Sequence, residues 1–272
     1  MSLFLIAFVA VIQGLTEFLP VSSSGHLVLI PVITGQPYQG RTIDVAAHMG
    51  TFFAVAWYVR EDLIAMTRAL FTGGKSSRQD FQMIWLLAVA TLPVVIIGYG
   101  VNKLDPAWLL DIRTLAIANL VFAGLLWASD RQGALGKTLT DMRFGAAVVI
   151  GLAQIGALIP GASRSGVTMT AARWLGFDRV SAARFSLLLS LPVIAGAGLL
   201  KGLDIAETGD VALGIDAALV ALLSGAVALV AIKWMMRWLA HASFTIFVAY
   251  RLLLGMALLT AIATGAIELG AA

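Results

Sequence analysis

Cysteine is absent from this 272-residue chain, and histidine occurs only three times. Without cysteine the protein has no disulfide bond, no thiolate metal site and no cysteine nucleophile. With so few histidines, a conventional zinc site built from cysteine and histidine is also excluded. Any chemistry must therefore come from hydroxyl, carboxylate, guanidinium or imidazole groups.

Charged residues are scarce as well, at 12% of the chain, whereas hydrophobic residues make up 60%. This charged share is about half of that in soluble domains. Several windows approach the roughly 20 apolar residues that a membrane-spanning helix needs. The formal net charge of +3 belongs to loops, and we expect no nucleic-acid partner. Because no low-complexity segment or long polar linker interrupts the chain, we expect one membrane domain over residues 1–272.

The apolar start of the chain has no lysine or arginine before position 41, and it carries Gln13 and Glu17. A cleavable signal peptide has a basic first region and then a continuous apolar one. We therefore interpret this run as part of the folded membrane protein.

Apolar runs predict helices rather than strands, because they are long and carry few strand signals. Two of them run into a proline, Pro20 or Pro160, which ends a helix. The polar turns that follow are tolerated at membrane depth only where protein or a water-filled cavity surrounds them. We predict an all-α protein with two re-entrant helix–turn–helix hairpins, the first hairpin at 1–38 and the second hairpin at 144–176, and about six transmembrane helices. The runs are 2–19, 45–59, 82–100, 114–128, 144–159, 185–200, 211–232 and 244–267.

Lysine and arginine predict the sidedness of the loops, because cytoplasmic loops carry an excess of both. Segments 101–113 and 201–210 balance or favour acidic residues and should lie outside. Six crossings then place both termini outside, so the first hairpin enters from the outer face and the second from the inner face. The basic segments expected in the cytoplasm are 60–80, 129–143, 173–184 and 233–241.

The turns of the two hairpins have closely similar sequences. One runs from Gln13 to Gly25 and the other from Gln154 to Gly166, and each ends in Ser-x-Ser-Gly. Thr-Leu-Pro-Val at 91–94 and Ser-Leu-Pro-Val at 190–193 form a weaker echo. A unit duplicated in opposite directions is an inverted-topology repeat, which places a site near the membrane midplane. We predict repeat one at about 1–128 and repeat two at about 144–272.

The first hairpin carries an acid. Gln13 and Glu17 are four residues apart and therefore lie on one face of a helix. A carboxylate at membrane depth costs about 2.5–3.5 kcal/mol and is a candidate for function; an ion pair that only holds two helices together is the alternative. Oxygen ligands suit Mg²⁺ or Ca²⁺, so Glu17, with Gln13 as a neutral second ligand, is a candidate metal site.

Three serines and a glycine follow the acid, and a helix begins near His26. Backbone N–H groups at a helix start bind phosphate well, although serines are also common N-caps. The imidazole of His26 is a candidate proton donor or acceptor, because histidine titrates near neutral pH. The candidate phosphate-binding residues of this turn are Ser22, Ser24 and Gly25, and Ser23 supplies the third hydroxyl.

In the second hairpin Arg164 takes the place of Ser23 when the two Ser-x-Ser-Gly segments are aligned. Guanidinium offers a planar fork of donors that suits phosphate, and an ion pair with Glu17 is the alternative. Together the hairpins are typical of a phosphoryl-transfer or phosphate-hydrolysis site. The phosphate-binding candidates around Arg164 are Gly161, Ser163, Ser165, Gly166 and Thr168.

Two further features leave alternatives open. Asp44 and His48, again four residues apart, either extend the site or mark the membrane boundary. The small residues Gly196-Ala-Gly198 pack helices within one protomer or between the subunits of a homodimer.

At these residues the chain resembles the undecaprenyl-diphosphate phosphatase family of the bacitracin-resistance type. The family pattern is (Glu/Gln)-x-x-x-Glu leading into Pro-Val-Ser-Ser-(Ser/Thr)-Gly-His, with a later Pro-Gly-x-Ser-Arg-Ser-Gly-x-Thr. These motifs stand here at 13–26 and 160–168, and further similarity covers 44–51 and 183–192. The resemblance extends over most of the chain. Position 13 is glutamine, so the first motif offers no second carboxylate here.

The resemblance implies a hydrolase of bacterial cell-wall synthesis and bacitracin resistance. Such an enzyme hydrolyses a polyprenyl diphosphate lipid, undecaprenyl diphosphate, to undecaprenyl phosphate and inorganic phosphate. It implies a place in the bacterial inner (plasma) membrane, an active site open to the outer, periplasmic side, and a divalent cation. By motif matching, the catalytic residues are Glu17, Ser23, His26 and Arg164.

Two mechanisms remain open from the sequence. In one, Ser23 attacks phosphorus while His26 or Glu17 takes its proton; in the other, His26 activates water and Ser23 only binds. The competing function is a transporter or flippase of an anionic lipid or solute, because an inverted repeat fits both. Flipping of the product is a further hypothesis.

Overall fold

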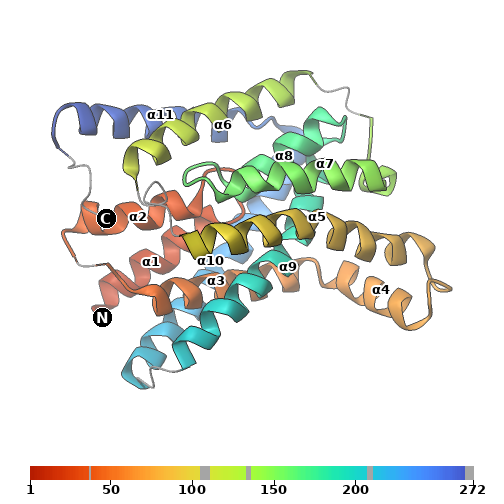
Figure 1. Cartoon of the computed structure of the whole chain (residues 1–272), viewed down its shortest axis with the longest axis horizontal. Coiled ribbons are helices and arrows are strands. Elements are labelled where there is room, and N and C mark those ends of the chain that lie inside the picture. The colour runs from red at the N-terminus through yellow and green to blue at the C-terminus, as the bar shows by residue number, and fades with distance from the viewer. Residues whose placement is uncertain (37, 105–110, 133–135, 207–210, 267–272) are drawn as a thin grey trace.

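The computed structural model describes residues 1–36, 38–104, 111–132, 136–206 and 211–266, and these fold into helices (Figure 1). The predicted all-helical class is confirmed. In the described part of the chain the only extended pairing is an isolated bridge between Lys137 and Phe177. The helices are α1 (Leu3–Thr16), α2 (Ser23–Thr34), α3 (Arg41–Tyr58), α4 (Arg60–Phe71), α5 (Arg78–Leu104), α6 (Ile112–Gln132), η2 (Leu139–Asp141), α7 (Phe144–Gln154), η3 (Ile155–Leu158), α8 (Arg164–Trp174), α9 (Arg179–Ala206), α10 (Val211–His241) and α11 (Thr245–Ala263).

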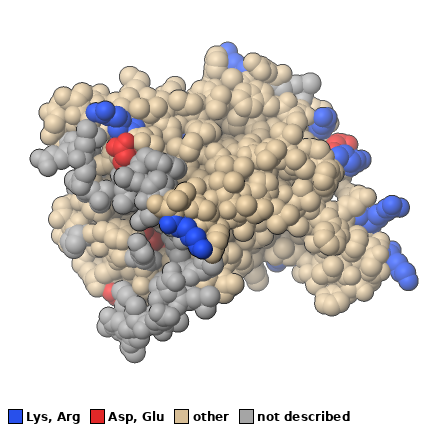
Figure 2. Space-filling view, viewed as in Figure 1, with Lys and Arg blue, Asp and Glu red and all other residues tan. Residues whose placement is uncertain are grey.

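Within the described ranges, five helices are long and apolar enough to cross a membrane, namely α5, α6, α9, α10 and α11. Much of their apolar surface faces outward; in α10, 28% of the most apolar window is buried inside the protein. Lysine and arginine lie mainly toward the ends of the molecule, and a broad uncharged surface lies between them (Figure 2). Lipid is the environment that accepts such a surface, and the chain is a multi-pass membrane protein.

The run at 45–59, predicted as a sixth crossing, differs from these five. It forms most of α3, whose first half includes Asp44 and His48, and α3 does not reach the hydropathy of a spanning helix. Helix α3 packs against α10 and α9, and its polar residues Asp44 and His48 are partly buried. The short helix α4 has an acidic first turn of Glu61 and Asp62, and the apolar runs did not predict it.

Two pairs of short helices form helix–turn–helix hairpins at the predicted places. Helices α1 and α2 are joined by residues 17–22, and helices α7 and α8 are joined by η3 and residues 159–163. Residues 17–25, which include the first residues of α2, are here called turn one, and residues 159–166, which include the first residues of α8, are here called turn two. In Figure 1, α1 and α7 begin toward opposite ends of the molecule and run toward its middle, where the two turns meet.

Both turns restart a helix at a serine with an unusual backbone conformation. Ser22 caps α2 with φ 75°, and Ser163 caps α8 with φ 70°. A positive φ is uncommon for residues other than glycine. These are the two serines that the aligned Ser-x-Ser-Gly segments pair, so the sequence alignment of the turns holds at the level of the backbone.

The two hairpins pack against the rest of the protein in a corresponding way. Helix α1 packs along α10, and α7 packs along α5. A Cβ on Gly14 would lie 2.5 Å from the carbonyl oxygen of Ser224, and a Cβ on Gly151 would lie 2.7 Å from that of Ala90. Small residues let helix backbones approach closely in membrane proteins. Glycine therefore sets the helix separation on both sides of the site.

Ion pairs at one end of the molecule join the segments that were predicted to be cytoplasmic. Arg173 Nε donates to Asp130 at 3.2 Å, and Arg184 Nη2 donates to Asp62 at 2.8 Å. These contacts bring segments 60–80, 129–143 and 173–184 together, as a shared side requires. Of the segments predicted to lie outside, residues 105–110 and 207–210 are not among the described residues.

Candidate active site

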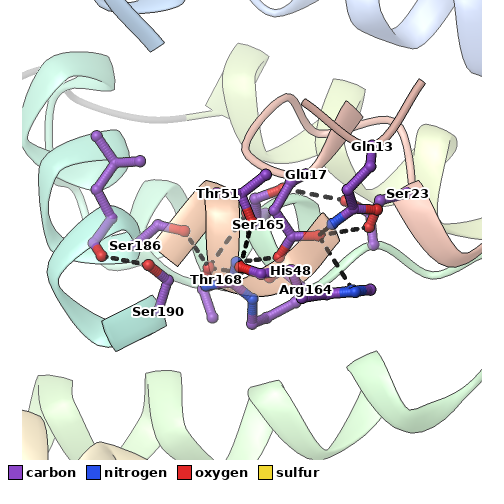
Figure 3. Close-up of polar contacts among 12 residues, drawn as sticks. Gln13, Glu17, Ser23, His48, Thr51, Arg164, Ser165, Thr168, Ser186 and Ser190 are labelled. Carbon is purple, nitrogen blue, oxygen red and sulfur yellow. Dashed lines mark hydrogen bonds and ion pairs between the residues drawn. The ribbon is translucent and has the colours of Figure 1, made fainter. Parts of the chain in front are cut away.

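Glu17 lies where the two turns meet, and hydrogen-bond donors surround its carboxylate (Figure 3). Arg164 Nη2 of the second hairpin is 3.0 Å from Oε1. Ser23 Oγ donates to Oε2 at 2.7 Å, and Gln13 Nε2 donates to the same oxygen at 2.9 Å. The side chain of Glu17 is only 6% exposed. The buried ion pair therefore connects an acid of one hairpin to a cation of the other.

His48 of α3 is a fourth group beside the carboxylate. Its Nε2 is 3.7 Å from Glu17 Oε2. Its Nδ1 lies 2.7 Å from the backbone carbonyl of Asp44, and a carbonyl only accepts, so Nδ1 carries the hydrogen. Nε2 is then the nitrogen that faces Glu17. Of the two readings of Asp44 and His48, the structure supports the one in which they extend the site.

A cavity of about 240 Å³ opens beside Glu17 between the two turns and helices α3, α5 and α9. Its lining residues are of two kinds, and these two sets are here called the polar wall and the apolar wall. The polar wall consists of Glu17, Ser22, Ser23, Ser24, Asp44, His48, Ser163 and Arg164. The apolar wall consists of Val45, Val94, Ala157, Leu158, Val193, Ile194, Ala197 and Gly198. The cavity thus offers hydrogen-bonding groups and apolar contacts to one ligand.

The repeated Leu-Pro-Val segments at 92–94 and 191–193 also contribute residues to this cavity. Val94 follows Pro93 inside α5, and Val193 follows Pro192 inside α9. Both valines line the apolar wall. The two halves of the sequence therefore contribute matched residues to one site.

The predicted site residues fall into two groups. Glu17, Ser22, Ser23, Ser24, Ser163 and Arg164 line the cavity. The other seven lie behind its wall, and these are Gln13, Gly25, His26, Gly161, Ser165, Gly166 and Thr168.

Two of the residues behind the wall brace the second hairpin. Ser165 Oγ donates to the carbonyl of Leu19 in turn one at 2.9 Å. Thr168 Oγ1 donates to the carbonyl of Arg164 at 3.0 Å and contacts Ser186 Oγ at 2.7 Å. These bonds hold the backbone beside Arg164 rather than facing a substrate.

The two glycines of the second turn allow close packing. Gly161 has φ +89°, and a Cβ there would lie 2.2 Å from the carbonyl oxygen of Leu115. A Cβ on Gly166 would lie 2.9 Å from Arg251 Nη1. Gly161 excludes a larger residue because the backbone of α6 lies directly behind it, whereas a side chain at Gly166 would have to displace the Arg251 guanidinium of α11.

His26 points away from the carboxylate. Its Nδ1 donates to the carbonyl of Ser22 at 2.7 Å, its Nε2 bonds to the hydroxyl of Tyr250, and its ring stacks on that of Tyr250. The imidazole is buried and touches the backbone of turn one rather than the cavity. Its predicted catalytic role stays a prediction.

Arg251 of α11 was missed by the sequence analysis. It is fully buried and donates to backbone carbonyls in both turns, including those of Pro20 and Gly161. The only signal in the sequence is a single arginine inside the apolar run 244–267. Backbone carbonyls leave no trace in a sequence, so its partners could not be foreseen.

The groups around Glu17 are placed as hydrogen-bond donors to its carboxylate and not as ligands of a divalent cation. Both carboxylate oxygens already accept from protein donors, and Gln13 is fully buried behind the wall. In the described part of the chain, no three acidic or histidine side chains are placed to hold one ion. A Mg²⁺ or Ca²⁺ ion at Glu17 and Gln13 stays a prediction.

Comparison with known proteins adds a separate line of evidence. Residues 6–257 match the family described as bacitracin resistance protein BacA. The chain is 46% identical over 265 residues to the undecaprenyl-diphosphatase of Ruegeria pomeroyi, covering 95% of this chain and 98% of that protein. It is 46% identical over 258 residues to the enzyme of the same name from Alcanivorax borkumensis, covering 92% and 95%. With the enzyme of that name from Desulforudis audaxviator, identity is 43% over 246 residues, covering 90% and 92%.

Proposed function

The chain belongs to the bacitracin resistance protein BacA family and is an undecaprenyl-diphosphatase, and we propose that its reaction takes place at Glu17 and Arg164. The reaction converts undecaprenyl diphosphate to undecaprenyl phosphate and inorganic phosphate. One observation carries the proposal: a carboxylate of turn one and a guanidinium of turn two meet at 3.0 Å in the lining of a cavity that also has apolar lining residues. Cationic donors placed where phosphoryl charge develops supply much of the catalysis in such reactions.

The two walls of the cavity orient the substrate. The diphosphate lies against Arg164 and the serines of turn one, where hydroxyl and guanidinium donors bind its oxygens. The first part of the polyprenyl chain lies against Val94, Val193 and Leu158, which offer no hydrogen bonds. A cavity of about 240 Å³ holds only the head of so long a lipid, and the rest of the chain extends into the bilayer.

Ser23 is the nucleophile in the mechanism that the geometry favours. Its hydroxyl already donates to Glu17 Oε2 at 2.7 Å, so the carboxylate is placed to accept the proton. Ser23 Oγ forms a bond to the terminal phosphorus, and the bond from that phosphorus to the bridging oxygen breaks. Undecaprenyl phosphate leaves, and the phosphoryl group remains on the serine.

Water completes the reaction. Glu17 gives the first proton to the departing undecaprenyl phosphate or to solvent. It then accepts a proton from water as the water oxygen forms a bond to phosphorus, the bond from phosphorus to Ser23 Oγ breaks, and Glu17 passes that proton to Oγ, which restores Ser23 and releases inorganic phosphate. The alternative is direct attack by water with Ser23 only binding. His26 is less well placed for either role, because its Nδ1 is hydrogen-bonded to the carbonyl of Ser22 and its Nε2 to the hydroxyl of Tyr250.

Arg164 changes partners when substrate binds. In the free protein it pairs with Glu17 and is 14% exposed. A diphosphate offers more negative charge and more acceptor oxygens than one carboxylate, so the guanidinium turns toward it. This frees an oxygen of Glu17 from its cationic partner and makes the carboxylate a better base.

A divalent cation, Mg²⁺ or Ca²⁺, is proposed only as a partner of the substrate. Magnesium is often held by one or two carboxylates together with substrate phosphates. No step above depends on the ion. Assays of phosphate release with and without a chelator test whether it is needed.

The membrane arrangement supports an inverted repeat. The opposed hairpins, the paired contacts of α1 with α10 and of α7 with α5, and the shared end of the basic segments fit repeats at about 1–128 and 144–272. We propose that the hairpins are re-entrant in the bacterial inner membrane and that the site opens to the periplasmic side. The homodimer stays a prediction: a Cβ on Gly198 would lie 2.7 Å from Met49 Sδ of the same chain, whereas a Cβ on Gly196 would meet no neighbour within 4 Å.

Phosphate release by purified protein in detergent tests this function. Hydrolysis of a polyprenyl diphosphate needs one compartment, whereas transport or flipping needs two. We expect release by the intact chain and loss of release in Arg164→Ala. An intact chain that releases no phosphate but moves an anionic lipid across vesicles would support the transporter or flippase instead.

A further inference from the structure

Arg251 is the most completely buried cation near the site, and the proposed reaction gives it no chemical step. Its side chain is 0% exposed, and it does not line the cavity. Among the ion pairs of the described residues, none involves Arg251. A guanidinium buried without an acid is costly unless other groups satisfy it, so its partners show what it does.

Those partners lie in both turns. Nη2 donates to the carbonyls of Gly161 at 2.8 Å and Ala162 at 3.0 Å in turn two. Nη1 donates to the carbonyl of Pro20 in turn one at 3.3 Å. The planar guanidinium of Arg251 thus hydrogen-bonds to both turns, and it is not among the residues that line the cavity.

Asn119 of α6 fixes the orientation of the Arg251 guanidinium. Arg251 Nε donates to Asn119 Oδ1 at 2.9 Å, and Asn119 Nδ2 donates to the backbone carbonyl of Arg251 at 2.9 Å. Asn119 is 1% exposed. The reciprocal pair leaves the guanidinium little freedom to rotate.

The tethered carbonyls are close in sequence to the reacting groups. Pro20 lies midway between Glu17 and Ser23, and Ala162 is two residues before Arg164. The turns also contain Ser22 and Ser163 at positive φ, and such conformations persist only where surrounding structure holds them. Arg251 is part of that structure.

Building on the function proposed above, we propose that Arg251, held by Asn119, is a positioning residue that sets turn one against turn two and so aligns Ser23 and Glu17 with Arg164. Small misplacements of reacting groups have large effects on rate. The group acts on the transition state through the turns and not through contact with substrate.

The test compares Arg251→Lys with Arg173→Lys in purified protein. Arg173 is the matched control, because it is also fully buried but pairs with Asp130 at the end of α8. Lysine keeps the charge but cannot reach Asn119, Pro20 and Gly161 together. We expect kcat to fall at least about tenfold in Arg251→Lys with KM within about threefold, and Arg173→Lys to keep its kcat at a similar loss of Tm.

Asn119 provides a second test if Arg251→Lys does not fold. Asn119→Asp keeps an acceptor for Nε and should keep kcat within about threefold, whereas Asn119→Leu should lower it about tenfold. Equal kcat in Arg251→Lys and the intact chain, equal kcat in the two Asn119 variants, or a loss of kcat that tracks Tm in both arginine variants would overturn the proposal. A lack of phosphate release by the intact chain would instead contradict the function itself.

Discussion

Turn one and turn two share a backbone but offer different groups to a substrate. In each, a serine with positive φ caps the following helix, and the two serine hydroxyls of Ser-x-Ser are near each other, at 3.5 Å for Ser22 and Ser24 and 3.1 Å for Ser163 and Ser165. The residue between them is Ser23 in one turn and Arg164 in the other. The two turns thus share a backbone geometry and differ in the side chain at the middle position of Ser-x-Ser, which lines the cavity in both.

In the proposed mechanism this difference makes both hairpins necessary. Turn one presents a hydroxyl next to a carboxylate, which suits attack on phosphorus and acceptance of a proton. Turn two presents a guanidinium, which suits the charge of the phosphoryl group. The ion pair between Glu17 and Arg164 and the bond from Ser165 to Leu19 join the two sets of groups. A change on either side should therefore damage the whole site.

The largest effect is expected from Ser23→Ala, which removes the group that distinguishes turn one. Loss of a nucleophile lowers kcat by about 10⁴-fold or more in comparable sites. Ser24→Ala is the matched control, because Ser24 also lines the cavity but does not bond to Glu17. Phosphate release measures both. Substantial turnover by Ser23→Ala would favour direct attack by water.

Glu17→Gln should have the next largest effect, because it removes the base and the partner of Arg164 at nearly constant shape. We expect kcat to fall about 10³-fold. Glu61→Gln is the control, since Glu61 is 84% exposed at the start of α4. Near-normal phosphate release by a folded Glu17→Gln protein would remove Glu17 from the mechanism.

Substitutions of His48 and His26 should have different effects on the pH dependence of kcat. His48→Gln should lower kcat about 10- to 100-fold and change its pH dependence, because His48 Nε2 faces Glu17. His26→Gln should lower kcat without changing the shape of the pH profile, because His26 is bonded to Ser22 and Tyr250. Measurement of kcat against pH separates them. The reverse pattern would restore His26 as the proton carrier.

The smallest effects on rate are expected from the glycines that set helix separation on the two sides. Gly14→Ala and Gly151→Ala place a Cβ against a carbonyl of the neighbouring helix, and overpacking of this kind costs about 1–3 kcal/mol. Gly145→Ala is the control, because no atom lies within 4 Å of its added Cβ. Thermal unfolding in detergent measures the change. Equal Tm in all three variants would show that the halves are not packed as described.

Features with a local physical cause were predictable from the sequence. The first helices of the hairpins end a few residues before the prolines, α1 at Thr16 and η3 at Leu158, and α2 and α8 begin within the paired Ser-x-Ser-Gly segments. The positions of both hairpins in the chain were therefore predicted correctly. The ion pair of Glu17 with Arg164 was foreseen as one of two alternatives. Both residues also line the cavity, so the pair and the phosphate site are compatible.

Features that depend on packing between distant helices were not predictable. Asp44 and His48 gave no sign of which helix they would face, and only the packing of α3 brings His48 to Glu17. Arg251 bonds to backbone carbonyls, which every residue has, so its role has no sequence pattern. The run at 45–59 predicted a crossing because the second half of α3 is apolar. The polar residues of the first half keep α3 below the hydropathy of a spanning helix.

A double-mutant cycle of Glu17→Asp and Arg164→Lys tests most directly whether the two hairpins form one site. Both changes keep charge and leave measurable phosphate release, and kcat/KM is determined for the intact chain, each single variant and the double variant. Groups that act together show coupling of about 0.5–3 kcal/mol. We predict that the double variant is clearly more active than the product of the two single effects. Effects that multiply to within about twofold, which corresponds to about 0.4 kcal/mol, would contradict a shared site.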